Sequence, residues 1–243
     1  MRAFRILLIV AVVLGGLFVI ADRVAVGFAE DEVADRLKAS EGLATTPDVS
    51  IKGFPFLTQV AGGELDDVEV GIKDYEADTG VSGQSIRIDD LNAQMRGVEF
   101  TGDYSSATAA TATGSATISY DQLLKAANAQ EAQLPLGITA KVVGLSDGGN
   151  GKIKVAVEVS TLKQPVYLLS SVTVVDGNTV RVSADSIPSL DDDVQLADAE
   201  VQSIADFEQK IEGLPGGIEL DSVEAGKTGV DISVKGSNVS LAG

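Results

Sequence analysis

The sequence predicts an α+β fold: a strongly curved, roll-like antiparallel sheet with a few packed helices, preceded by an N-terminal apolar helix. Many segments alternate apolar and polar residues with a period of two, and most are joined by short turns, as in antiparallel sheets. An apolar run from Ile6 to Ala21 precedes all of them. A meander of about ten strands must curl or split, so we expect marked curvature.

Residues 1–23 predict a signal peptide or an uncleaved membrane anchor. Arg2 and Arg5 lead into the apolar run, and Asp22 ends it. The run would rise roughly 24 Å as a helix, which is shorter than the roughly 30 Å of a bilayer's hydrocarbon core. That length suits a signal peptide cleaved after Ala21, but an anchor could continue through residues 24–29. In both cases residues 24–243, expected to form a single domain, lie outside the cytoplasmic membrane.

The remaining elements follow from periodicity, capping residues and turn residues. Helices are predicted at 30–43, 56–61, from the Ser119–Gln122 capping box to about 128, and from the Asp191–Asp193 acidic run to near 213. Strands are predicted at 48–52, 65–73, 84–88, 91–98, 107–120, 138–143, 152–160, 166–175, 179–184, 217–224, 229–235 and 238–241, with a bulge or bend at 96–98 and a type I′ turn at Asp176–Gly177. The chain could also form two sheet-plus-helix halves that divide near residue 128.

The composition excludes several kinds of chemistry. Cys and His are both absent, which removes disulfides, thiolate or imidazole metal sites and Ser-His-Asp catalysis. The net charge of −18 opposes binding to nucleic acid. Carboxylate pairs such as Asp66–Asp67 and Asp191–Asp192 could serve a hydrolase or bind a metal, but solvated acidic turns explain them more simply. We therefore expect no enzyme activity, no metal and no cofactor.

Two segments are candidates for binding apolar molecules. The block from Gly53 to Gln59 contains Phe54, Phe56 and Leu57 in a chain with seven Phe and no Trp. It is interpreted either as a core corner filled by aromatic rings or as a hydrophobic mouth that touches an acyl chain or a membrane. The second candidate is a face of small residues along the strand at 107–120: Ala110, Ala112, Gly114, Ala116 and Ile118. That face could line an apolar space or let a helix pack closely.

These segments carry a resemblance to a known family. Gly53–Gln59 with Gly63, residues 110–124, Leu214–Ile218 and the final Gly236–Leu241 resemble the LmeA family of phospholipid-binding proteins of actinobacteria. The resemblance implies an exported cell-envelope protein that binds phospholipid in a tubular hydrophobic pocket and supports assembly of lipomannan, a phosphatidylinositol-anchored glycolipid. Phospholipid is therefore one expected partner. The N-terminal segment predicts the membrane as another, and an envelope glycosyltransferase is a further candidate. The Leu214–Gly217 loop is less apolar than in relatives, which affects the expected shape of the pocket.

Three hypotheses about function follow. The leading one is a non-enzymatic protein that binds an anionic, phosphatidylinositol-type phospholipid. The second is a membrane-tethered adaptor with a solid core that contacts a glycosyltransferase. The third is a hydrolase with two acidic side chains facing one cleft.

Overall fold

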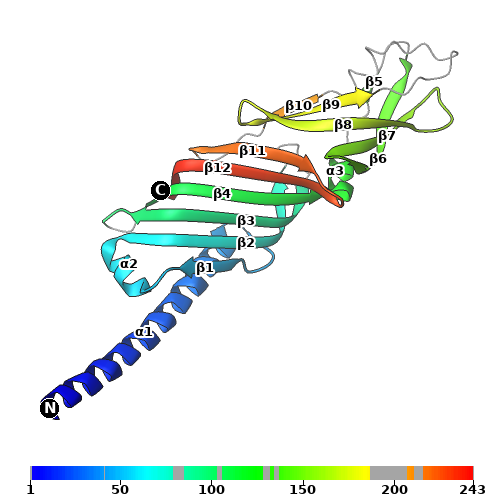
Figure 1. Ribbon diagram of the computed structural model, residues 1–243. Helices are drawn as coiled ribbons and strands as arrows, with labels where there is room; N and C mark the ends of the chain where they lie inside the picture. The colour runs from blue at the N-terminus through cyan, green and yellow to red at the C-terminus, as the bar shows by residue number, and fades with distance from the viewer. Residues whose placement is uncertain are drawn as a thin grey trace.

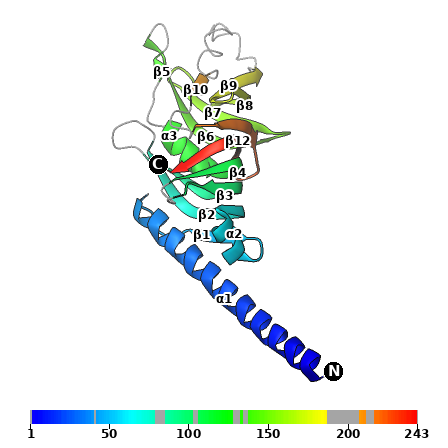
Figure 2. The same cartoon turned by 90° about the vertical axis from the view of Figure 1, so that its left-hand side faces the viewer.

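The computed structural model describes residues 2–40, 42–78, 85–102, 106–127, 132–133, 137–186, 207–210 and 216–242. Within these residues the strands form two six-stranded antiparallel sheets, and a long N-terminal helix projects from the first of them (Figure 1). The second sheet lies at the end of the molecule remote from the N-terminus in both views (Figures 1 and 2). The α+β class and the antiparallel sheets are therefore confirmed, and the strands have split into two sheets. Strong curvature stays a prediction.

The described helices are α1 (Arg2–Ser40), α2 (Phe56–Gly62) and α3 (Tyr120–Ala127). The amphipathic helix predicted from residue 30 is the last part of α1, because no proline interrupts the chain between the apolar run and residue 40. Pro55 precedes α2, and Gly63 ends it in the left-handed conformation with a φ of 78°. The predicted helices at 56–61 and after Ser119 are confirmed.

The first sheet has the order β1-β2-β3-β4-β12-β11. Its strands are β1 (Asp48–Lys52), β2 (Glu64–Asp78), β3 (Ser85–Phe100), β4 (Ala107–Ser119), β11 (Ile218–Ala225) and β12 (Gly229–Ala242). The segments predicted as two strands at 84–88 and 91–98 are one continuous strand, and so are those at 229–235 and 238–241. The first and the last described strands, β1 and β12, thus share one sheet.

The second sheet has the order β10-β9-β8-β7-β6-β5. Its strands are β5 (Ala132–Gln133), β6 (Thr139–Gly149), β7 (Lys152–Val159), β8 (Val166–Val175), β9 (Thr179–Ser186) and β10 (Phe207–Lys210). Asp176 and Gly177 both have positive φ, 53° and 67°, which confirms the predicted type I′ geometry between β8 and β9. The division near residue 128 is confirmed only in part, since β11 and β12 return to the first sheet.

The helix predicted to follow Asp191–Asp193 is wrong where the structure describes that segment. Phe207–Lys210 is strand β10, paired antiparallel with Thr179–Val182 of β9. The apolar spacing there favours a helix, but tertiary context decides the conformation. As a strand, the segment pairs with the backbone hydrogen-bonding groups along the open edge of β9. The remaining residues of that prediction lie outside the described residues, as does the acidic run itself.

Buried side chains form three clusters. The first lies between the first sheet and helices α1 and α2, and includes Val26, Phe56 and Ala109. The second lies within the second sheet, around Leu168 and Val157. The third joins the two sheets at β11, β12 and α3. In addition, the N–H of Leu220 donates to the carbonyl oxygen of Gly177 at 2.7 Å, which ties the sheets together through their backbones.

A bend crosses the first sheet at one row of residues. Gly97 on β3 has a φ of 59° and Asn238 on β12 has a φ of 52°. The strand register is the same on both sides of Gly97, so the predicted irregularity at 96–98 is a bend rather than a bulge. The alternation of buried and exposed side chains shifts at this row: Ala109 and Ala112, three residues apart, both lie in the first cluster.

Candidate functional site

A set of polar contacts joins α1 to the Gly53–Gln59 block where the exposed apolar part of α1 ends. We call it the latch; its residues are Asp22 and Arg23 on α1 and Leu57 in the block. The side chain of Asp22 is fully buried, and its Oδ1 accepts the backbone N–H of Leu57 at 2.8 Å. Arg23 donates to Asp22 Oδ2 at 2.8 Å, and its guanidinium lies 5.2 Å from the ring centre of Phe54. The same guanidinium reaches the carbonyl oxygen of Gly53 at 3.5 Å. The block is thereby held at a fixed level along α1.

The three apolar residues of the block have different surroundings. Phe56 is buried in the first cluster, with 7% of its surface exposed. Phe54 and Leu57 are 57% and 37% exposed. Both interpretations of the block therefore apply in part: Phe56 fills the core corner, while Phe54 and Leu57 form an apolar surface that we call the lip.

Gly53 and Gln59 fix the shape of this block. Gly53 has a φ of 97°, and a Cβ at this position would collide with the side chains of Gln59 and Asp66. Gln59 Oε1 accepts the backbone N–H of Asp66 at 2.8 Å and so connects α2 to β2. The glycine is required both by its conformation and by the close approach of these two side chains.

The small-residue face along β4 is only partly as predicted. Ala112 and Ile118 are buried, and Gly114 and Ala116 are half-buried. Ala110 is exposed, and its neighbour Ala109 is fully buried in its place. The bend at the Gly97 row causes this shift, because the simple alternation used for the prediction does not continue through it.

Two rows of apolar residues cross four strands in the middle of the first sheet. Cross-strand pairing places Val70, Ala93, Gly114 and Val234 in one row and Ile72, Leu91, Ala116 and Ile232 in the next. All eight are half-buried, and the rows lie between the first cluster and the third. We call these eight residues the aliphatic strip. Partly exposed apolar surface of this kind can accept hydrocarbon.

The close-packing alternative explains Gly114 within the strip. A Cβ at Gly114 would lie 2.8 Å from Val234 Cγ2, so the valine of the neighbouring strand occupies that space. The packing partner is a strand and not the helix that was expected. Sequence alternation identified the small residues of β4 but could not identify Ala93 or Val234, because cross-strand neighbours are not encoded in the spacing of one segment.

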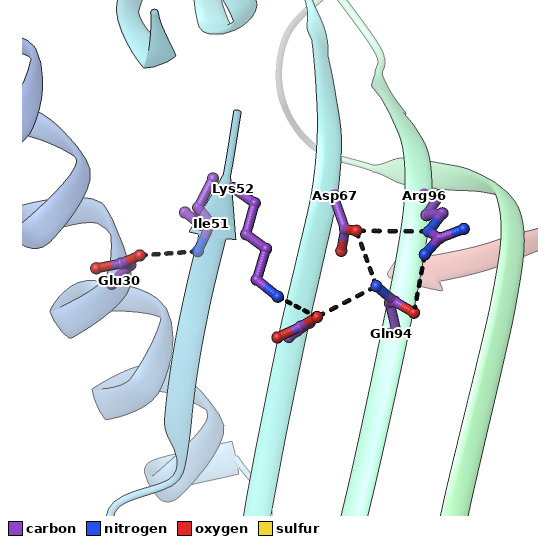
Figure 3. Close-up of polar contacts among 7 residues, drawn as sticks. Glu30, Ile51, Lys52, Asp67, Gln94 and Arg96 are labelled. Carbon is purple, nitrogen blue, oxygen red and sulfur yellow. Dashed lines mark hydrogen bonds and ion pairs between the residues drawn. The ribbon is translucent and has the colours of Figure 1, made fainter. Parts of the chain in front are cut away.

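The opposite face of the first sheet is polar and carries an ion-pair network (Figure 3). Lys52 pairs with Glu69, and Gln94 Nε2 donates to Asp67 Oδ2 at 2.8 Å and to Glu69 Oε1 at 3.2 Å. Arg96 lies 3.4 Å from Asp67. A shallow hollow of about 440 Å³ on this face is lined mainly by polar residues: Asp48, Ser50, Glu69, Asn92, Gln94, Thr113 and Ser115. Asp67 and Glu69 each have a cationic partner, as in a structural ion-pair network.

Three groups with shifted pKa values each have a structural explanation. The hydrogen bond and charge of Asp221 raise the pKa of Lys235. The hydrogen bonds from Ser171 lower the pKa of Asp185, assisted by Lys152 and opposed by burial. Burial, together with the charges of Asp147 and Asp231, raises the pKa of Tyr120. Each shift arises from contacts that hold strands or α3 in place.

The described residues offer no cluster of metal ligands, and the chain matches one family model. Within the described ranges, no group of three or more acidic side chains is placed to hold a metal ion. A family model described as LmeA-like phospholipid-binding matches residues 20–235. No match was found among curated proteins or among solved structures. The matched range begins two residues before Asp22 and includes the lip and the aliphatic strip.

Proposed function

This chain belongs to the LmeA-like phospholipid-binding family, and from that membership we propose that it binds a phospholipid whose acyl chains lie against the aliphatic strip of the first sheet. The observation that carries the proposal is the pair of half-buried apolar rows between the first cluster and the third. Each methylene group that such a surface buries fully contributes about 0.8 kcal/mol.

The charge of the protein constrains how the lipid is held. With a net charge of −18, the chain repels an anionic head group at long range. Acyl-chain burial must therefore supply most of the affinity. We propose that the head group is of the phosphatidylinositol type and that binding supports lipoglycan assembly outside the cytoplasmic membrane, with an envelope glycosyltransferase as partner. Membership of the family is what supports these finer proposals.

We propose a non-enzymatic role. The family is a lipid-binding one. Of the acidic residues considered for a hydrolase, Asp67 is bonded to Gln94 and lies near Arg96. The backbone N–H of Asp66 is bonded to Gln59, and its side chain lies beside Gly53. Asp191 and Asp192 lie outside the described residues.

Lipid retention tests the proposal. The full chain is purified from its native envelope in detergent, and its bound lipids are identified by mass spectrometry. It is then delipidated, offered isotope-labelled phosphatidylinositol, phosphatidylethanolamine and phosphatidylglycerol, and passed through size exclusion. We expect stoichiometric retention of phospholipid. Failure to retain any phospholipid or fatty acyl ligand overturns the proposal and leaves the membrane-tethered adaptor as the alternative.

A further inference from the structure

α1 has two parts with opposite surroundings. Residues 2–21 are exposed along the whole of their length, and they belong to the helix Arg2–Ser40, which is long and apolar enough to cross a membrane. From Asp22 onwards the helix packs on the protein, with Val26 and Ala34 buried. Figures 1 and 2 both show the N-terminal part projecting away from the sheets. The part after Asp22 is thus built into the folded domain.

The length of the apolar run determines where the membrane boundary falls on α1. The run from Ile6 to Ala21 rises roughly 24 Å, which leaves the roughly 30 Å hydrocarbon core incompletely spanned. Continuation of the helix to Phe28 extends the rise to roughly 34 Å. Val24 and Phe28 are 53% and 70% exposed, so this extension keeps an apolar outer face. The outer boundary of the membrane therefore lies within residues 22–28.

The latch places the lip at this same level. Leu57 is bonded to Asp22, and Phe54 lies against Arg23, so both exposed side chains of the lip sit beside the start of the 22–28 segment. Exposed Phe and Leu side chains are favourable in the interfacial region of a bilayer, where an Arg head can reach lipid phosphates. In water the same side chains would expose apolar surface at a cost.

We propose that the lip, Phe54 with Leu57, inserts into the outer leaflet of the bilayer in which α1 is anchored. This inference does not depend on lipid binding at the aliphatic strip. It requires that α1 is not cleaved from the protein. The binding partner of the lip is then the lipid bilayer itself. The domain then rests on the bilayer with α2 at the head groups, while the second sheet stands away from it.

Single-tryptophan quenching in vesicles tests the inference, since the chain has no Trp of its own. The variants Phe54→Trp and Leu57→Trp are reconstituted as full chains into phospholipid vesicles that contain lipids brominated near the glycerol end of the acyl chain. Tyr167→Trp on β8 is the matched control, because Tyr167 is 54% exposed but lies in the remote second sheet. We expect a blue-shifted emission and a loss of intensity for the lip variants only.

Two results would overturn the inference. One is quenching of both lip variants no stronger than that of Tyr167→Trp, in proteins whose circular dichroism matches that of the parent. The other is quenching that disappears when Ala116→Leu is added to obstruct the aliphatic strip, since the quencher would then be a bound lipid and not the bilayer. Quenching that persists in the Ala116→Leu background supports membrane insertion, whether or not the strip binds lipid.

Discussion

The carboxylate of Asp22 accepts the backbone N–H of Leu57 at 2.8 Å across 35 residues of sequence. Through this bond a residue at the end of an apolar helix fixes the first turn of α2, and Arg23 completes the contact. A buried carboxylate is tolerated only where hydrogen-bond donors satisfy it. For Asp22, Leu57 and Arg23 supply such donors. The apolar N-terminal helix and the Gly53–Gln59 block are therefore fixed to each other at this point.

Removal of this carboxylate should loosen that attachment. Asp22→Ala leaves the N–H of Leu57 without its partner, and we expect the thermal unfolding midpoint to fall by about 2–8 °C. Asp35→Ala is the control, because Asp35 lies on the same helix with an exposed side chain. Thermal denaturation of both variants in detergent micelles measures the difference. Equal midpoints would show that the latch does not contribute to stability.

The bend across the first sheet depends on Gly97. Gly97→Ala places a side chain at a φ of 59° and only 3.0 Å from the Cβ of Ala110, so we expect a loss of about 1–2 kcal/mol in the free energy of unfolding. Gly102→Ala, where nothing lies within 4 Å of the added Cβ, should be neutral or slightly stabilising. Urea titration of both variants is the measurement, and similar losses in the two would contradict a special role for the bend.

Tyr120 connects α3 to the turn between β11 and β12. Its hydroxyl group donates to the carbonyl oxygen of Gly226 at 2.8 Å, and the ring is buried in the third cluster. Tyr120→Phe keeps the ring and removes this bond, so we expect a loss of about 0.5–1.5 kcal/mol at neutral pH. Chemical denaturation at pH 7 measures it, and an unchanged midpoint would indicate that water replaces the hydroxyl group.

The same residue predicts a pH dependence. Burial and two nearby carboxylates raise the pKa of Tyr120 above its usual value of 10.0, so the folded state keeps the phenol proton that the unfolded state releases. The unfolded state then binds fewer protons, and stability falls as the pH rises above 10. We expect the parent protein to lose stability more steeply than Tyr120→Phe between pH 9 and 11. Parallel slopes over this window would show that the phenol does not contribute.

Obstruction of the aliphatic strip should reduce lipid retention. Ala116→Leu adds three carbons to a half-buried position of the strip, whereas Ala110→Leu adds the same three to an exposed position on the same strand. We expect phospholipid retained after size exclusion to fall severalfold for Ala116→Leu and to stay at the parent level for Ala110→Leu. Mass spectrometry of the extracted lipids makes the comparison. Equal retention would place the acyl chains elsewhere.

Most strands could be predicted from the sequence because alternation is a local property. On β7, Ile153, Val157 and Val159 are buried while Lys154 and Glu158 point to solvent, as their spacing indicates. Alternation failed at Ala110 because the bend depends on Gly97 and Asn238, which lie on neighbouring strands. The row of residues at which the sheet bends is seen only once β3, β4 and β12 are paired. The sequence of β4 alone does not predict it.

The site was predictable in part for the same reason. The density of aromatic side chains identified Phe54 and Phe56, but their spacing could not show that one is exposed and the other buried. Asp22 looked like the residue that ends an apolar run, and its contact with Leu57 depends on tertiary packing across 35 residues. The strand at Phe207–Lys210 was missed because the open edge of β9 decides its conformation.

Because β12 lies between β4 and β11, the first sheet cannot be completed during synthesis until β12 has been made. The ribosome makes Ser119 long before Gly229, so the backbone edge of β4 has no strand partner until the residues of β12 have been made. An unpaired edge of this length is a template for pairing with other chains. The edge of β4 therefore stays open to such pairing until β12 has been made and paired.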